Sequence, residues 1–268
     1  MFEGFFGFIA QPLGVILNWI YENIAFHNYG VAIIIFTLII KCALLPLMIK
    51  QQKSSREMQK IQPKLKEMQK MYKNDPQKLH AETLRLYQEN GVNPGAGCLP
   101  ALLQMPILLS LYYVVSKPLT FMKGMSASKI ASLAAEISGK SMNTYYKELI
   151  IVSHNKILNM NFLGLDLSKI PDFNKIFNGN NRTEYLALLI LPILATVTIY
   201  FSSKINMKNM SEMGQTESSG KVMMYLPIVM TALFSFKVPA GLAIYWIVDN
   251  LFRIGQQIYI NKCVMVDD

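Results

Sequence analysis

A lysine interrupts an otherwise apolar stretch of the sequence, AIIIFTLIIKCALLPLMI, at position 41. An ammonium group near the middle of a membrane span costs roughly 2.5–3.5 kcal/mol on insertion scales, so such a residue is a candidate for function. Lys41 lies about eleven residues, or ~17 Å, from the outer end of the predicted span. Thr37 extends the polar stripe by one helical turn. We expect Lys41 to face a water-filled cavity; the alternative is a side chain that extends along the lipid to the cytoplasmic surface.

A second group of polar residues lies in another apolar segment, near the C-terminus. Trp246, Asn250, Arg253 and Gln257 follow one another at spacings of 4, 3 and 4 and share a helix face, with Asp249 on an adjacent face. A helix surrounded by lipid does not carry this many polar side chains, so they must contact protein or water. Asp249 lies about nine residues, or ~14 Å, inside its span, a depth similar to that of Lys41. We therefore hypothesise that the two approach each other, directly or through water.

Composition and motifs exclude most other chemistry. The chain has 268 residues, of which 52% are hydrophobic and 16% charged, with a net charge of +9. Soluble domains carry about 25% charged residues, so the chain is predicted to be a polytopic membrane protein with basic cytoplasmic segments facing anionic lipid. The sequence has no Gly-rich phosphate loop, nucleophile elbow or metal-ligand cluster. We expect no catalytic residue, no metal, no cofactor and no small-molecule substrate, and hence a protein that is not an enzyme.

The predicted fold is an all-α polytopic membrane protein with five transmembrane helices. These spans are 30–49, 98–115, 185–201, 222–236 and 240–258. The third and fourth are short for a hydrocarbon core of about 30 Å and require a locally thinner bilayer. Residues 1–29 contain no Lys or Arg. They are therefore not a secretory signal and are expected to form an amphipathic helix in the membrane interface.

Basic residues predict the orientation of these spans. Residues 1–29 carry none, whereas residues 50–97 carry ten Lys and Arg. The positive-inside rule then places the N-terminus outside and residues 50–97 in the cytoplasm. Alternation puts the 116–184 loop outside, and the 202–221 loop and the 259–268 tail inside. The 116–184 loop carries nine basic residues of its own, but it is long enough for the rule to lose force.

Residues 50–97 are predicted to form a helical hairpin. Apolar residues at spacings of 3, 4, 3 and 4 form a helical seam, at Met58, Ile61, Leu65, Met68 and Tyr72. Asp75 and Pro76 are typical of the start of a second helix, and Gly91 of its end. The first helix carries a row of lysines, which are Lys60, Lys64, Lys66, Lys70 and Lys73. These either form a solvated face or dock an acidic partner.

Three stretches make the family recognisable. GVNPGAGCLPALLQMPI (91–107), VPAGLAIYWIVDNLFRIGQQ (238–257) and NFLGLDLSKIP (161–171) resemble the YidC/Oxa1/Alb3 membrane protein insertase family, and most of all its shorter, Gram-positive-type YidC members. The order of five spans with a hairpin after the first also matches. The resemblance extends over the chain from about residue 25 onward.

The resemblance implies a function and a site. Members of this family insert newly made membrane proteins into the bacterial cell membrane and help them fold, alone or with the Sec translocon. They do so through a hydrophilic groove that opens to the cytoplasm and to lipid. The implied groove residues are Thr37, Lys41, Thr196, Thr198, Trp246, Asp249, Asn250 and Gln257. The hairpin would receive clients and contact ribosomes, targeting components or the Sec translocon.

This sequence departs from the family pattern inside the implied groove. Lys41 stands where the family usually has arginine, so a point charge replaces a bidentate fork. Asp249 stands where an uncharged residue is more usual, and the third span offers no amide. The alternative function is an ion- or proton-coupled transporter that uses Lys41 and Asp249. Against it, the sequence shows no inverted repeat of spans.

Overall fold

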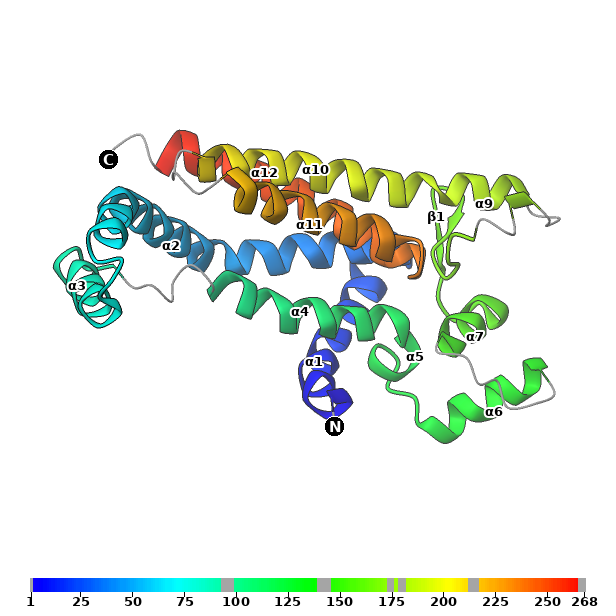
Figure 1. The fold of residues 1–268 in the computed structure, drawn as a ribbon. Coiled ribbons are helices and arrows are strands. Elements are labelled where there is room, and N and C mark those ends of the chain that lie inside the picture. The colour runs from blue at the N-terminus through cyan, green and yellow to red at the C-terminus, as the bar shows by residue number, and fades with distance from the viewer. Residues whose placement is uncertain are drawn as a thin grey trace.

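The protein is built almost entirely from helices (Figure 1). The computed structural model describes residues 2–92, 99–138, 146–172, 176–177, 182–211 and 217–264. Long helices lie side by side in a bundle, in which α12 packs against α2 and α10, α10 also packs against α11, and α1 packs against α4. The bundle helices are α2 (Tyr29–Met71), α4 (Leu99–Ser116), α10 (Ile190–Ser211), α11 (Glu217–Ser235) and α12 (Ala240–Tyr259).

Helix α2 is a single helix of 43 residues. It begins after Asn28, whose side chain accepts a hydrogen bond from the Val31 amide at 3.1 Å. The sequence predicts a boundary between the span 30–49 and the hairpin that follows, but the helix continues through it. Lys, Gln, Glu and Met favour helix as strongly as the apolar residues before them, so the change in polarity does not stop it. The first span and the first hairpin helix are thus one element.

Helix α3 (Pro76–Glu89) follows α2 with the predicted caps. The Asp75 carboxylate accepts a hydrogen bond from the Lys78 amide at 3.0 Å, and Gly91 follows the helix with a φ of 63°. Ile61 of α2 and Leu86 of α3 are buried in the hairpin. The end of the bundle that carries α3 is called the hairpin end below. Residues 93–97 of the predicted hairpin lie outside the described residues.

The remaining bundle helices depart from their predicted bounds mainly at the hairpin end. Helix α10 continues to Ser211 and α11 begins at Glu217, so both helices extend into the predicted 202–221 loop. Residues 212–216 of that loop, and residues 265–268 of the predicted tail, lie outside the described part. Helix α12 is followed by a π-helical turn, η2 (Ile260–Val264).

The 116–184 segment forms a small layered region at the opposite end, the loop end. Its helices are α5 (Pro118–Phe121), α6 (Ala127–Ser138), α7 (Lys147–Asn155) and, at its boundary, α9 (Arg182–Leu188). Strands β1 (Asn161–Phe162) and β2 (Leu165–Asp166) form an antiparallel hairpin that the sequence does not predict. The buried Glu148 carboxylate joins α7 to α5, because it accepts bonds from the Thr120 amide at 2.9 Å and hydroxyl at 2.7 Å.

The loop end also fixes where α12 begins. The first four N–H groups of a helix lack intrahelical partners. In α12 the Ala240 amide donates to the Lys169 carbonyl at 2.9 Å, and the Gly241 amide donates to the Leu167 carbonyl at 3.1 Å. These two bonds hold the start of α12 against the segment after β2. They therefore set the depth at which the polar residues of α12 lie.

Helix α1 (Phe2–Asn23) crosses the bundle steeply and packs against α4, α2 and α5 (Figure 1). Leu17 and Ile20 are buried against these helices, whereas Phe8 is 82% exposed. A β-carbon added at Gly14 would lie 2.3 Å from the Phe121 carbonyl oxygen, so this position requires glycine for close packing on α5. Apolar residues thus occupy both the packed and the open side of α1.

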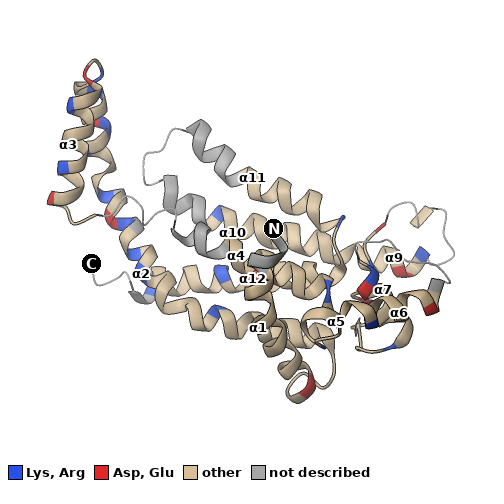
Figure 2. Ribbon diagram, turned by 90° about the horizontal axis from the view of Figure 1, so that it is seen from below, with Lys and Arg blue, Asp and Glu red and all other residues tan. Residues whose placement is uncertain are grey.

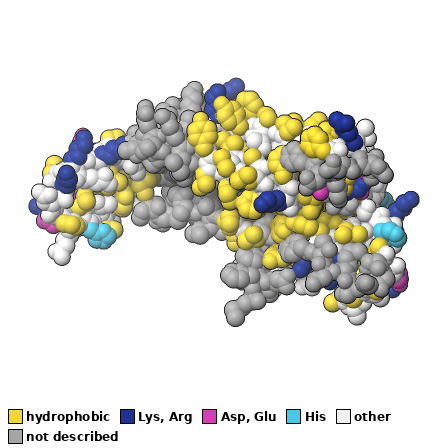
Figure 3. Space-filling model, turned by 45° about the vertical axis from the view of Figure 1, so that its right-hand side comes forward, with side chains coloured by type: hydrophobic (Ala, Val, Ile, Leu, Met, Phe, Trp, Pro, Cys, Tyr) yellow, Lys and Arg dark blue, Asp and Glu magenta, His cyan; other side chains and the backbone are white. Residues whose placement is uncertain are grey.

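The density of charged and of hydrophobic residues changes along the long axis of the bundle. Charged residues gather at the hairpin end and the loop end, with few between them (Figure 2). Hydrophobic side chains dominate the middle of the face in Figure 3. Among the described residues, two segments are long and apolar enough to span a bilayer; the mean hydropathy of the apolar window is 2.6 in Tyr29–Met71 and 2.1 in Arg182–Ile205. Only 28% and 33% of these apolar windows are buried within the protein, so most of their residues face outward, as in a helical membrane protein.

Candidate functional site

Lys41 and Asp249 meet inside the bundle, as hypothesised from their depths. Lys41 lies on α2 and its ammonium pairs with Oδ1 of Asp249 on α12. The two side chains are only 3% and 8% exposed. A buried charge is tolerated when an opposite charge accompanies it, because desolvation is then offset by attraction at low dielectric. The pair explains how a lysine can lie within an apolar bundle.

Asp249 has a second cationic partner on its own helix. Arg253 lies one turn further along α12, and its Nε donates to Asp249 Oδ2 at 2.8 Å. The Arg253 side chain is 38% exposed. The three residues Lys41, Asp249 and Arg253, called the charge triad below, combine two positive charges with one negative charge. The site therefore keeps a net positive charge although Lys41 is paired.

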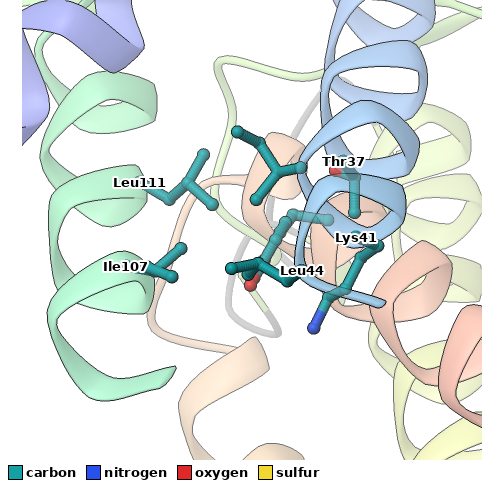
Figure 4. A pocket seen from close by; sticks show the side chains of 7 residues that line it. Thr37, Lys41, Leu44, Ile107 and Leu111 are labelled. Carbon is teal, nitrogen blue, oxygen red and sulfur yellow. The ribbon is translucent and has the colours of Figure 1, made fainter. Parts of the chain in front are cut away.

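The water-filled cavity expected beside Lys41 stays a prediction; the structure describes the surroundings of Lys41 on the side that faces α4. A space of about 220 Å³ lies between α2 and α4, but it is too narrow to admit a water molecule among the described residues. Figure 4 shows Ile107 and Leu111 of α4 on one side of this space and residues of α2 on the other. Its lining residues are Thr37, Ile40, Lys41, Leu44, Ile107, Leu111 and Tyr245. Apolar side chains therefore form most of the lining on the α4 side of Lys41.

Thr37 lines the same space as Lys41, on the same side of α2. It is buried one turn from Lys41, and its hydroxyl donates to the Ile33 carbonyl of α2 at 2.6 Å. A hydroxyl that donates to its own helix can still accept a hydrogen bond from another group. Thr196 is similar, since it donates to the Pro192 carbonyl at 2.8 Å. Trp246 is half-buried against the apolar core.

Thr198 and Asn250 form a polar contact between α10 and α12. The Asn250 amide nitrogen lies 3.4 Å from the Thr198 hydroxyl oxygen, and both residues are buried. The Thr198 hydroxyl in turn donates to the Leu194 carbonyl at 2.8 Å. Together with the charge triad, this contact places buried polar groups on α2, α10 and α12. Six of the eight predicted groove residues are thus buried polar residues between helices or within α2.

Polar contacts continue from the triad toward the hairpin end. The Gln257 amide donates to Asn261 Oδ1 at 3.0 Å, and Arg56 of α2 donates to the same oxygen at 2.8 Å. Gln51 of α2 is also buried, and its amide nitrogen has no hydrogen-bond partner among the described residues. These four residues, Gln51, Arg56, Gln257 and Asn261, are called the polar track. It joins α2 to the end of α12.

The sequence did not predict three members of the polar track, which are Gln51, Arg56 and Asn261. It placed Arg253 on a polar helix face without including it among the groove residues. Arg253 was on the recognised polar face of α12, so its spacing was a sufficient signal. Arg56 looked like one more cation in a basic segment, and Asn261 lay beyond the last predicted span. Their contact depends on the packing of α2 against α12, which no local pattern encodes.

The predicted docking lysines lie along the outside of the hairpin. Lys60, Lys64, Lys70 and Lys73 are exposed, and Lys66 is half-buried. Figure 2 shows blue residues along α3 and the adjoining part of α2. This surface is separate from the buried triad, although α2 carries both.

The architecture and the site define a helical membrane protein with buried polar residues between its long helices. The family model described as 60Kd inner membrane protein matches residues 19–267. The chain is 36% identical to Membrane protein insertase YidC 2 of Listeria innocua over 261 residues, which covers 95% of this chain and 71% of the relative. It is 34% identical to Membrane protein insertase YidC of Oceanobacillus iheyensis over 259 residues, or 93% and 82% of the two chains.

A longer relative shows the same similarity. Membrane protein insertase YidC of Chlorobaculum parvum is 35% identical over 253 residues, which is 94% of this chain and 36% of the relative. The chain therefore belongs to the 60Kd inner membrane protein family, that is, the YidC/Oxa1 family. This membership confirms the resemblance drawn from the sequence motifs, and it identifies a bacterial inner membrane protein.

Proposed function

We propose that this protein is an insertase that moves newly made membrane proteins from the cytoplasm into the bilayer and helps them fold. The observation that carries the proposal is the charge triad, which holds a net positive charge between lipid-facing helices. The relatives of this protein described above are named membrane protein insertases. The alternative of an ion-coupled transporter is not favoured, because no such activity is named among these relatives.

The mechanism uses electrostatic attraction and apolar burial and makes no covalent change. An acidic or polar tail is costly to move through hydrocarbon. A net positive site inside the bundle attracts such a tail, because attraction is stronger where water is excluded. The polar track of Gln51, Arg56, Gln257 and Asn261 supplies the hydrophilic, cytoplasm-open route to it. The client's apolar segment then enters lipid, where burial contributes ~25 cal/mol per Å².

The proposal includes a topology and partners. Five spans run through the bundle, with the N-terminus outside and the hairpin end in the cytoplasm, and α1 lies in the outer interface. Exposed lysines of the hairpin face the ribosome, the targeting machinery or the Sec translocon, because a basic surface attracts acidic groups on a partner. The support for this arrangement is the ten basic residues of segment 50–97.

Crosslinking tests the route directly. A photo-reactive residue is placed at position 37, 198 or 246 of the full chain in liposomes, so that Lys41 is retained, and a small single-span membrane protein is synthesised in their presence. We expect crosslinks from positions 37 and 198 to the client's translocated tail. Position 226 on α11, where Leu226 faces outward, is the matched control. Silence at all three test positions while insertion proceeds would exclude the proposed route.

A charge series at position 41 adds a second test. Lys41→Arg keeps the cation and is expected to retain insertion, whereas Lys41→Gln is expected to fail mainly for clients with acidic tails. The clients are matched pairs that differ only in Asp and Glu or Asn and Gln in the tail. Equal insertion of both clients by the wild type and by Lys41→Gln would contradict the proposal.

A further inference from the structure

Asp249 occupies the position that an acidic client residue would need. It is a carboxylate paired with the buried Lys41 ammonium, and its other oxygen accepts from Arg253 at 2.8 Å. A client's Asp or Glu carries the same chemical group. In this structure the protein thus supplies its own carboxylate to the cation that the proposed mechanism offers to clients.

There is no room for a second carboxylate beside the first on the side that faces α4. The space next to Lys41 is about 220 Å³ and too narrow for a water molecule among the described residues. It is bounded on the α4 side by Ile107 and Leu111 (Figure 4). A carboxylate is larger than water, so a client acid cannot join Asp249 from the α4 side, and exchange with Asp249 is the route that this side leaves open.

Arg253 offers Asp249 a partner once Lys41 is taken. It already holds Asp249 Oδ2, it lies one turn nearer the hairpin end, and its side chain is 38% exposed while that of Lys41 is 3% exposed. A rotation of the Asp249 side chain toward Arg253 would release Lys41 without leaving a buried carboxylate unpaired, which would be costly. The helical spacing of four residues keeps the two groups within reach throughout.

We propose that Asp249 is an internal competitor: it occupies Lys41 until the carboxylate of a client's translocated tail displaces it, and Arg253 then retains it. This inference rests on the proposed insertase function. It makes Asp249 a residue that limits how much acidic client the site receives, while Lys41 provides the preference for acids, because an ammonium binds a carboxylate more strongly than a neutral amide. Clients without an acid in the tail are therefore discriminated against at the triad.

The test measures how strongly each of two clients crosslinks to a probe close to Lys41, in variants of the full chain. The clients are an isogenic pair with acidic or amide tails, supplied below saturation, and the probe sits at position 37. Asp249→Asn is expected to raise crosslinking of the acidic client several-fold and to leave the amide client unchanged. Glu89→Gln, an exposed carboxylate on α3, is the matched control and is expected to change neither. Unchanged or reduced crosslinking of the acidic client in Asp249→Asn would overturn the inference.

Arg253 variants separate competition from simple attraction. Arg253→Gln is expected to lower crosslinking of the acidic client several-fold, because Asp249 then binds Lys41 alone. In the double variant with Asp249→Asn this loss of crosslinking should disappear, because position 249 then carries no carboxylate that Arg253 would have to bind. A double variant that stays well below Asp249→Asn would mean that Arg253 attracts clients directly, which overturns its role here. If Asp249→Asn does not fold, Asp249→Ser takes its place in the single and double variants, with the same outcomes.

The same data separate this inference from the proposed function. If wild type and Lys41→Gln crosslink the acidic client equally, the function assigned to the cation is wrong. If the wild type exceeds Lys41→Gln but Asp249→Asn does not exceed the wild type, only the competition fails.

Discussion

Helix α2 carries the same kind of side chain in two opposite environments. Lys41 is 3% exposed and pairs with Asp249, whereas Lys60, Lys64 and Lys70 on the same helix are exposed. The exposed lysines are hydrated with or without a partner, so a nearby acid adds little. Lys41 has lost most of its water, so its partner decides whether the charge is tolerated. Burial, rather than charge, therefore separates the candidate site from the candidate docking surface.

The largest effect should come from Lys41→Gln. Breaking a buried pair usually costs 3–5 kcal/mol, and we expect about 3 kcal/mol because Arg253 still contacts Asp249. The measurement is denaturant unfolding of the full chain in lipid nanodiscs. Lys64→Gln, at an exposed position of the same helix, is the control and should leave the unfolding transition where it is. Equal effects of the two substitutions would break the comparison.

A smaller loss is expected for Glu148→Ala at the loop end. The substitution removes the acceptor of the Thr120 amide and hydroxyl, which costs about 2 kcal/mol when both groups are buried. Glu148→Gln keeps one amide oxygen as acceptor and should recover part of the loss. The same unfolding assay measures both. An Ala variant as stable as the wild type would show that burial alone does not make a carboxylate important here.

Lys169 at the loop end tests a half-buried cation. Burial lowers its pKa, but Glu184 at 2.5 Å and Asp166 more than compensate, so the pKa of Lys169 is raised above its usual value. A cation with a raised pKa in the folded state stabilises it at all pH values below its ordinary pKa, and this contribution is lost as the pH rises through the raised pKa. The melting temperature of the wild type should therefore exceed that of Lys169→Gln at pH 8. The difference between the two melting temperatures should disappear above about pH 10.4. A gap that stays constant with pH would argue against this pair.

The smallest effect on stability is expected in the hairpin. Replacing Lys60, Lys64, Lys66, Lys70 and Lys73 by glutamine should leave thermal unfolding unchanged, because these side chains lie at the surface. Binding of the full chain to purified ribosomes should weaken and lose much of its salt dependence. Unchanged ribosome binding at low salt would make these lysines a solvated face only.

The sequence predicted those features whose signals are local or set by depth. The start of α3 follows from Asp75 and Pro76, and the meeting of Lys41 with Asp249 follows from similar depths in two spans. Both rest on rules that hold for a helix before it packs.

Features that depend on packing were not predictable in the same way. The contact of Arg56 with Asn261 requires α2 to lie along the end of α12. The narrowness of the space beside Lys41 depends on how Leu111 and Tyr245 pack around it. The continuity of α2 was missed for another reason. A change from apolar to charged residues marks a membrane boundary, yet it leaves helix propensity almost unaltered.

The unbroken course of α2 has a mechanical consequence. A helix of 43 residues is about 64 Å long, so the buried ammonium and the outermost lysines belong to one rod. Pro46 lies five residues beyond Lys41 inside this rod, and a proline removes one backbone bond and makes bending easier there. Pro63 forms a second such point nearer the hairpin, so torque on the hairpin would reach the cation through a rod with two flexible points, one of them next to Lys41.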